Sequence, residues 1–135
     1  MAEANRPLAL RRAEQARREV EKLENQSYGH YVSYVRALPA EILQMGLGQA
    51  LATQLAAARG DKKNPHRILY DQMERWLCSA HVETPIPEGK NLMNAIVEHD
   101  EATYLRAQAE ALAYLEWLKK FAVAFLKHPG KGDEQ

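Results

Sequence analysis

Hydrophobic positions recur along most of the chain at spacings of three and four residues, which is the period of an amphipathic α-helix. Alternation of apolar and polar residues is rare, and Val, Ile and Thr, which favour strands, are sparse. Ala, Leu, Glu, Arg, Gln and Lys, which favour helices, dominate instead. The pattern therefore predicts an all-α fold, a single-domain helical bundle of five to seven helices with no sheet.

The N-terminal part of the chain predicts two helices. The first is expected to begin near Pro7, because proline loses no hydrogen bond at the start of a helix. A narrow seam of small apolar residues follows and indicates close approach to a neighbouring helix; its members are Ala9, Ala13, Ala16, Val20 and Leu23. Ser27 is a suitable N-cap for the second helix. This helix is expected to end near Leu38, because Pro39 disfavours helical geometry in the residue before it.

Glycine and proline divide the middle of the chain into shorter helices. The segments expected to be helical are 39–45, about 47–60 and 66–80, followed by a short helix that contains Leu92 and Ile96. Gly46 and Gly48 are read as a helix junction, since no strand precedes them as a phosphate-binding loop would require. The segment 82–89 contains two prolines and is expected to be a loop.

The last helix carries the clearest pattern. Asp100 is a good N-cap, and the helix is expected to continue to about Lys127. Apolar side chains cover most of its circumference, with Tyr104, Ala111, Leu115, Leu118, Ala122 and Phe125 on the central face. Such a helix is either central to its own core or shared with a partner, so we expect it to be long and largely buried. The helical domain is expected to span residues 1–127, and the tail 128–135 is expected to be disordered.

Composition narrows the function classes. No run approaches the roughly 20 apolar residues of a membrane span, and the N-terminus does not resemble a secretory signal. We therefore expect a cytoplasmic protein with no membrane contact. The net charge is zero, with a surplus of three positive charges in residues 1–75 and of three negative charges in residues 76–135. A chain of this charge is a poor candidate for tight binding of nucleic acid on its own, because phosphate neutralisation supplies most of that affinity.

The sequence offers little enzymatic chemistry. No phosphate-loop, dinucleotide, nucleophile-elbow or zinc-protease motif is present, and the single Cys78 excludes an internal disulfide. The one acidic–imidazole cluster is formed by Glu98, His99 and Asp100, and helix capping already accounts for Asp100. We predict no catalytic residue, no metal and no cofactor, and keep an enzyme built on this cluster as the rival hypothesis.

Three stretches together resemble one known family. They are segment 31–39 (YVSYVRALP) with 46–52 (GLGQALA), segment 70–77, and Asp100 and Tyr104 with the run 109–122 (AEALAYLEWLKKFA). In order and spacing they are similar to the small subunit of Cmr-type (type III-B) CRISPR RNA-guided effector complexes, and the resemblance extends from about Leu8 to Leu126. Met45 stands where the family pattern has asparagine, and Gln108 where it has threonine.

The resemblance implies a structural subunit without enzymatic activity. Its expected partners are the backbone and large subunits of the Cmr complex, further copies of itself, and the guide and target RNA held in the complex. Two alternatives stay open: the small subunit of a related type III-A or type I CRISPR effector, and a helical adaptor that contacts only protein.

Candidate contact residues follow from the basic and apolar surfaces. For RNA phosphates we rank first the loop group, then the first helix, then the last helix; the residues are Arg59, Lys62, Lys63 and Arg67, then Arg11 and Arg18, then Lys119 and Lys120. The loop group ranks first because only Asp61 neutralises it within the loop. For each group an ordinary solvated surface is the competing interpretation. Ala13 and Trp117 are the candidate residues for contacts between subunits.

Overall fold

Six α-helices make up the part of the chain that the structure describes, which is residues 6–26, 30–79, 86 and 91–126 of a computed structural model. They are α1 (Leu8–Glu21), α2 (Tyr31–Met45), α3 (Leu47–Ala58), α4 (Pro65–Leu77), α5 (Leu92–Glu98) and α6 (Glu101–Phe125). No strand occurs among these residues. The prediction of an all-α helical bundle is therefore confirmed. The expected loop 82–89 and tail 128–135 fall almost wholly outside the described residues.

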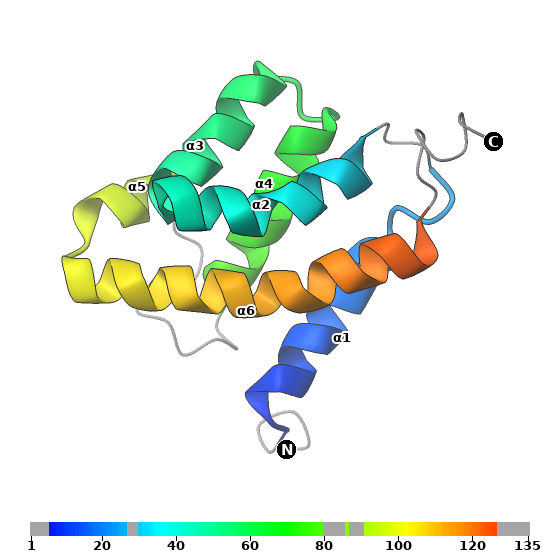
Figure 1. Cartoon of the computed structure of the whole chain (residues 1–135), viewed down its shortest axis with the longest axis horizontal. Coiled ribbons are helices and arrows are strands. Elements are labelled where there is room, and N and C mark those ends of the chain that lie inside the picture. The colour runs from blue at the N-terminus through cyan, green and yellow to red at the C-terminus, as the bar shows by residue number, and fades with distance from the viewer. Residues whose placement is uncertain (1–5, 27–29, 80–85, 87–90, 127–135) are drawn as a thin grey trace.

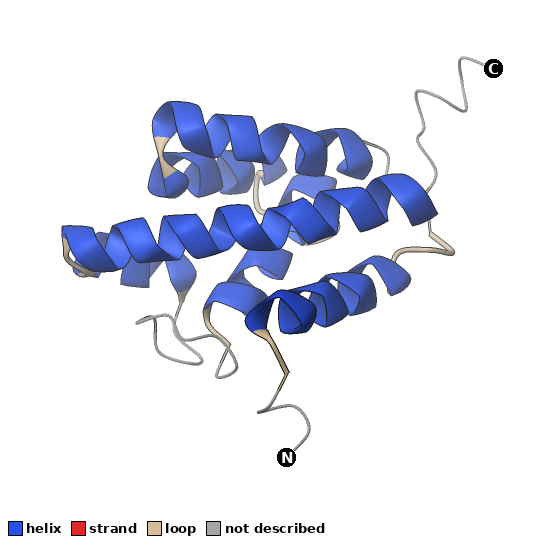
Figure 2. Ribbon diagram, turned by 60° about the horizontal axis from the view of Figure 1, so that its bottom comes forward, coloured by secondary structure: helices blue, strands red, loops and turns tan. Residues whose placement is uncertain are grey.

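The longest helix, α6, organises the bundle. It runs along the long axis of the molecule, with α1 crossing it on one side and α2 packed on the other (Figures 1 and 2). Helices α3 and α4 pack against each other and against α2, while α5 joins this group through α3. The ends of α1 and α6 and the start of α2 lie toward the same end of the molecule (Figure 1).

The core lies along one face of α6. Ala111, Tyr114 and Leu118 are fully buried there, and the Tyr114 ring stacks on Trp76 of α4 with ring centroids 5.1 Å apart. The small Ala111 leaves space for the neighbouring backbone, while the two stacked rings fill the space between helices. The apolar circumference that the sequence indicates is only partly covered, because Leu105 is 52% exposed and Phe125, which we expected on the central face, is 49% exposed at the end of the helix.

The second helix differs from the prediction. We expected it to end near Leu38 and a separate helix to begin at Pro39, but α2 continues through Pro39 to Met45. Proline removes one backbone hydrogen bond from a helix interior, at a cost of about 3 kcal/mol. Val35, Leu38 and Ile42 are completely buried on a common face on both sides of Pro39. Burying this face against α6 offsets the cost, so packing keeps the helix continuous.

Other helix ends agree more closely with the sequence. Asn64 caps α4 by accepting a hydrogen bond from the His66 N–H at 2.8 Å, and Asp100 caps α6 by accepting from the Thr103 N–H at 2.9 Å. The predicted N-cap Ser27 lies outside the described residues, and His30 occupies the N-cap position of α2. The seam of the first helix is buried only in its second half.

Helix α6 also positions the junction between α2 and α3. Gly46 has φ +88°, a conformation that favours glycine, and directly follows α2. The Leu47 N–H donates to Gln108 Oε1 at 2.8 Å, and the Gly48 N–H donates to the Tyr104 hydroxyl at 2.9 Å. Side chains of α6 thus satisfy two backbone groups at the start of α3, which every helix leaves without partners inside the helix.

Candidate nucleic-acid interface

The exposed loop between α3 and α4 carries three cations without an acidic partner. Arg59 ends α3 in the left-handed conformation with φ 54°, and Gly60 follows with φ +79°. Lys62 and Lys63 are exposed in the loop. Among the residues that the structure describes, no carboxylate pairs with Arg59, Lys62 or Lys63. A phosphate that approaches this loop therefore meets hydrated cations with no internal ion pair to displace.

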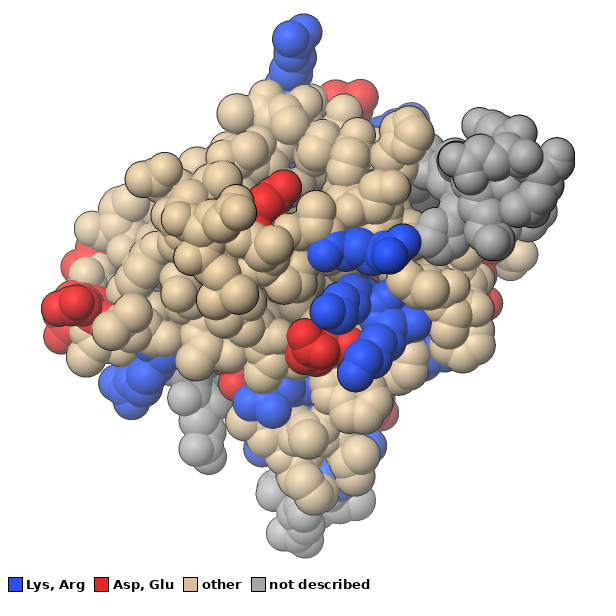
Figure 3. Space-filling view, in the orientation of Figure 1, with Lys and Arg blue, Asp and Glu red and all other residues tan. Residues whose placement is uncertain are grey.

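Local hydrogen bonds hold the loop in shape. The Asp61 carboxylate accepts from the Lys63 backbone N–H at 2.9 Å, so the single acid of the loop forms a turn and does not pair with either lysine. The backbone N–H of Asp61 donates to the Ala58 carbonyl at 3.0 Å. These bonds fix the backbone from which the lysines project, and Figure 3 shows a basic side chain projecting beyond the outline where α3 ends.

Arg67 belongs to the same region but is neutralised. Its Nε donates to Asp71 Oδ1 at 2.9 Å, one turn further along α4, and this hydrogen bond raises the pKa of Arg67. The ranking from sequence considered only the acid inside the loop, and this i,i+4 partner lies beyond it. Both side chains remain partly exposed, so the pair can exchange for a phosphate contact at a modest cost.

The arginines of α1 are engaged with acids. Arg18 pairs with Glu14 at 2.7 Å, and Glu14 also accepts from Arg6 at 2.5 Å. Arg11 is half-buried and has interactions of its own. The structure does not bring Arg11 or Arg18 to the loop, because they lie on α1, which packs mainly against α6.

The last basic group shares one acid. Lys119 and Lys120 lie 3.4 Å and 3.7 Å from the two oxygens of Glu116 on the C-terminal half of α6. Figure 3 shows basic side chains gathered beside an acidic one over this part of the molecule. Lys120 is 69% exposed and Lys119 32%. Lys119 is therefore the less accessible of the two for a phosphate contact.

The two candidate interface residues are only partly covered. Ala13 on α1 is half-buried, as is Trp117 on α6. Trp117 heads a ladder of rings spaced one turn apart, with centroids 5.7 Å from Trp117 to Phe121 and 6.1 Å from Phe121 to Phe125. The Arg17 guanidinium lies over the Phe125 ring, 4.0 Å from its centroid. Neither Ala13 nor Trp117 is sealed inside this chain, so both stay predicted interface residues.

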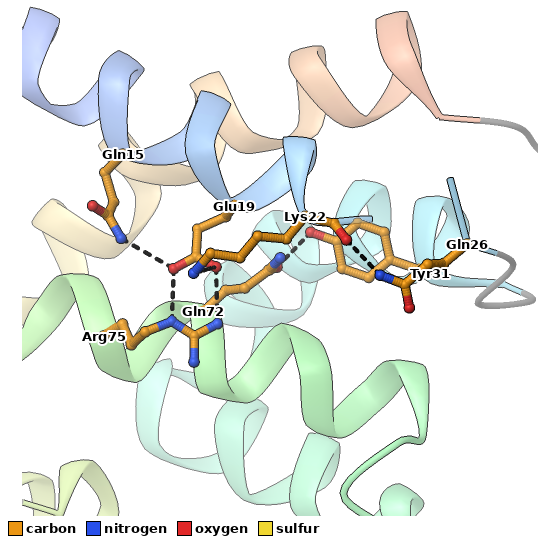
Figure 4. Close-up of polar contacts among 7 residues, drawn as sticks. All are labelled: Gln15, Glu19, Lys22, Gln26, Tyr31, Gln72 and Arg75. Atoms are coloured by element: carbon orange, nitrogen blue, oxygen red, sulfur yellow. Dashed lines mark hydrogen bonds and ion pairs between the residues drawn. The ribbon is translucent and has the colours of Figure 1, made fainter. Parts of the chain in front are cut away.

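A buried polar network joins α1 to α4, and sequence reasoning missed it (Figure 4). Glu19 is 1% exposed and accepts two hydrogen bonds from Arg75, at 2.7 Å and 2.8 Å. Gln15 donates to the same carboxylate, and the Lys22 amine lies 3.6 Å away. Beside it, the Tyr31 hydroxyl donates to Gln72. These polar groups satisfy one another, so the network fixes helix positions.

A second buried pair has the same structural character. Arg12 donates twice to Glu110, at 2.6 Å and 2.8 Å, and the Trp76 indole N–H donates to that carboxylate at 2.9 Å. The bidentate bond raises the pKa of Arg12. These three side chains come from α1, α6 and α4, which no local sequence pattern connects.

Comparison with known proteins decides the family. The family model described as "CRISPR-associated protein (Cas_Cmr5)" matches residues 8–125. The chain belongs to the Cmr5 family. It is 32% identical over 107 residues to the "CRISPR system Cmr subunit Cmr5" of Thermus thermophilus, and the aligned region covers 79% of this chain and 84% of that protein. The crystal structure of a CRISPR-associated Cmr5 family protein, also from Thermus thermophilus, superposes with a TM-score of 0.72 at 28% identity, covering 90% of this chain and 100% of that one.

Family membership confirms the resemblance to the Cmr small subunit predicted from sequence, and the structure explains the motif that carried it. Gly46 and Gly48 form the α2–α3 junction, where a Cβ on Gly46 would lie 2.8 Å from the Tyr104 hydroxyl oxygen. The motif residues 46–48 and Tyr104 are therefore one packed unit of this Cmr5-family fold. Gln108, a departure from the family pattern, is also part of it through its bond to Leu47.

In the rival enzymatic cluster, Asp100 has a structural role. In this Cmr5-family chain Asp100 caps α6, and hydrogen bonds from Thr103 lower the pKa of its carboxyl. Within the described ranges, no group of three or more His, Cys, Asp and Glu side chains is placed to hold a metal ion. Cys78 is buried, and burial raises the pKa of its thiol to about 11, so little thiolate forms at neutral pH.

No helix in the described part of the chain has the length and apolar content needed to cross a membrane.

Proposed function

We propose that this Cmr5-family protein is a non-catalytic structural subunit of a type III-B CRISPR ribonucleoprotein in the cytoplasm. In this role it stacks with further copies of itself beside the backbone and large subunits, and it helps to hold guide and target RNA. The observation that carries the proposal is the α3–α4 loop, whose three cations have no acidic partner in the described structure, in a chain of zero net charge. A basic surface this small suits an RNA contact that works inside a larger assembly.

The chemistry of the loop suits RNA held by base pairing. Lys and Arg contact phosphates without reading the bases, and in guide-directed recognition the pairing itself supplies the sequence specificity. The subunit then needs only a sequence-neutral grip. Arg59, Lys62 and Lys63 rank first for this grip, and Arg67 contributes when it exchanges Asp71 for a phosphate.

The two ends of α6 support stacking of copies. Near its start, Val97 at the end of α5 is 75% exposed and Leu105 of α6 is 52% exposed, close in sequence to the acids Asp100 and Glu101. Toward its other end Phe125 is 49% exposed, and the pair Lys119–Lys120 lies one to two turns before it. Exposed apolar groups flanked by acids at one end and by bases at the other suit a head-to-tail contact that repeats. The candidate interface residue Trp117 extends the second surface through its contact with Phe121, and Ala13 on α1 stays a separate candidate.

Absence of catalysis is part of the proposal. Its support is that Asp100 of the rival cluster caps α6, and that the buried acids Glu19 and Glu110 pair with arginines in the described structure. A general base needs a free side chain within reach of a substrate proton. Cleavage of target RNA is then left to other subunits of the complex.

The test is charge reversal in the reconstituted complex. Lys62→Glu together with Lys63→Glu should weaken target RNA binding about equally for all target sequences, because phosphates are the same in each. Each phosphate contact that the variant abolishes should also make the dependence of log K on log salt shallower by about 0.7. Affinity is measured by titration at several salt concentrations.

A matched control has the same change in charge. Lys119→Glu with Lys120→Glu should have the smaller effect, because Glu116 already neutralises part of that pair. Unchanged affinity of the loop variant across the salt titration would remove the loop from the RNA path. Unchanged affinity of both variants would favour the adaptor that contacts only protein.

A further inference from the structure

Three aromatic rings lie together beside the basic loop. The Tyr34 ring of α2 stacks on the His66 ring of α4, with centroids 3.7 Å apart and planes within 13°. The His30 ring, at the start of α2, lies 6.2 Å from Tyr34 at an angle of 46°. His30 is exposed, and Tyr34 and His66 are half-buried. These three side chains form a ring cluster that reaches the surface.

Hydrogen bonds fix the ring nearest to the loop. His66 Nδ1 lies 2.8 Å from Gln54 Oε1, and Gln54, which is 2% exposed, donates through Nε2 to Glu41 at 3.2 Å. The His66 backbone N–H is held by the Asn64 cap. Burial lowers the pKa of the imidazole, so the ring is neutral at pH 7. A flat ring that is already held in place loses little entropy when a ligand stacks on the cluster.

Two of the loop cations lie directly before His66 in the chain. Lys62 and Lys63 precede His66 by four and three residues, in the loop whose turn the Asp61 carboxylate closes. Stacked aromatic rings beside exposed cations are the combination that binds single-stranded nucleic acid: the bases stack on the rings and the phosphates meet the cations. The ring ladder from Trp117 to Phe125 differs, because Arg17 already lies over its last ring and is paired with Glu24 at 2.6 Å.

We propose that the cluster of His30, Tyr34 and His66 stacks an unpaired base of the RNA whose phosphates the α3–α4 loop holds. This inference rests on the proposed RNA contact of the loop and adds a base-stacking contact to it. Stacking is tolerant of sequence, since every base has a π-face, so the contact preserves the sequence-neutral grip. The contact is expected on a single-stranded portion of the RNA, where bases are free to leave the helix.

The experiment compares ring and lysine variants in the reconstituted complex. His30→Ala with Tyr34→Leu should weaken binding of single-stranded RNA about 5- to 100-fold and leave the salt slope unchanged, because the phosphate contacts all remain. Tyr34→Trp keeps a stacking ring and should preserve the affinity. Target RNA with 4-thiouridine at successive positions should crosslink to His30 or Tyr34 in the unmodified complex. Leu43→Ala removes an exposed apolar side chain elsewhere on α2 and serves as the control.

The outcomes separate this inference from the proposed function. If the lysine variant loses affinity while the ring variant keeps it and no crosslink forms at the rings, stacking is wrong and the phosphate grip stands. If the ring variant makes the dependence of log K on log salt shallower, as the lysine variant does, the rings only position the loop. Stacking is wrong in that case too. If neither variant changes affinity, both proposals fail. The thermal midpoint of each variant, measured before assembly, identifies loss caused by unfolding, and in that case the Tyr34→Trp affinity and the crosslinks decide.

Discussion

Single buried charges decide how α1 sits on the rest of the bundle. The sequence suggests that the acids of this helix pair with arginines on the same helix, and Glu14 and Arg18 do so. Glu19 instead turns inward to Arg75 of α4, 56 residues away. A buried carboxylate requires a partner with good geometry, because leaving it alone is far more costly than the pair is worth. Burial also raises the pKa of the neighbouring Tyr31 and Tyr114 hydroxyls, so both stay neutral.

Removing the partner of Glu19 should destabilise the protein. Arg75→Met keeps the apolar stem but leaves the carboxylate with only Gln15 and Lys22. We expect the free energy of unfolding to fall by about 2 kcal/mol, below the cost for a fully buried pair because Arg75 is half exposed. Urea denaturation followed by circular dichroism measures the change. The control Arg18→Met removes an exposed i,i+4 partner and should barely move the midpoint; equal midpoints for the two variants would contradict the inward role of Glu19.

The boundaries of two helices in this fold, α2 and α3, depend on side chains that are distant in the sequence. The α2–α3 junction has a local signal in Gly46 and Gly48, but the groups that complete it, Tyr104 and Gln108, come from α6. The continuation of α2 through Pro39 has the same origin, since the burial on either side of the proline is supplied by other helices. Glycine and proline in the sequence therefore indicate where a helix can end, and tertiary packing decides at which of these positions it does end.

The junction makes a prediction about coupling. Gly46→Ala forces a Cβ to within 2.8 Å of the Tyr104 hydroxyl and keeps the unfavourable φ of +88°, so it should destabilise more than Gly60→Ala, which has φ +79° and nothing within 4 Å. Tyr104→Phe alone should cost about 1 kcal/mol, because the Gly48 N–H is left without its acceptor.

The double variant is the decisive measurement. In Tyr104→Phe the clashing oxygen is gone, so Gly46→Ala should cost less there than in the parent protein. A double-mutant cycle from urea denaturation gives this coupling. Additive costs would mean that the hydroxyl does not limit the space at Gly46.

At the scale of the whole molecule, the two ends of α6 differ in charge and both expose apolar side chains. Leu105 near the start of α6 and Val97 at the end of α5 lie close in sequence to acids, and Phe125 at the end of α6 follows the lysines Lys119 and Lys120. A contact between unlike ends leaves one free end of each kind on a pair, so further copies can add to it. The stacking proposed above has this form.

Blocking one end at a time tests the stack. Val97→Lys places a cation where the lysines of the next copy would lie, and Phe125→Asp places an anion opposite the acids. The unmodified protein should show a mass that rises with concentration in light scattering. Each variant alone should lose this rise. An equimolar mixture should recover pairs but no longer assemblies, because each variant keeps one intact end.

A control and a contrary result complete this test. Leu10→Lys changes an exposed apolar residue on α1 and should not affect the assembly. If the mixture recovers nothing, or if Leu10→Lys is as harmful as the end variants, a head-to-tail contact through α6 is wrong.

The fold class, the family and most helix positions could be predicted from the sequence. Helical periodicity is a local property, so the existence of the helices in the described ranges and the cap at Asp100 follow from neighbouring residues. The position of the basic loop was also predictable, because the residues from Arg59 to Lys63 are contiguous. Helical spacing also locates the acids one turn away from the candidate basic residues Arg18, Arg67, Lys119 and Lys120.

Which charges pair across the bundle depends on the tertiary structure. Arg67 and Arg18 pair with acids one turn away on their own helices, whereas Glu19 and Glu110 bind arginines from other helices. The ring cluster has the same kind of origin, since α2 and α4 bring together Tyr34 and His66, which are 32 residues apart in sequence. Ion pairs and ring stacks act over a few ångströms of space, and a linear pattern does not encode which distant segments come within that range.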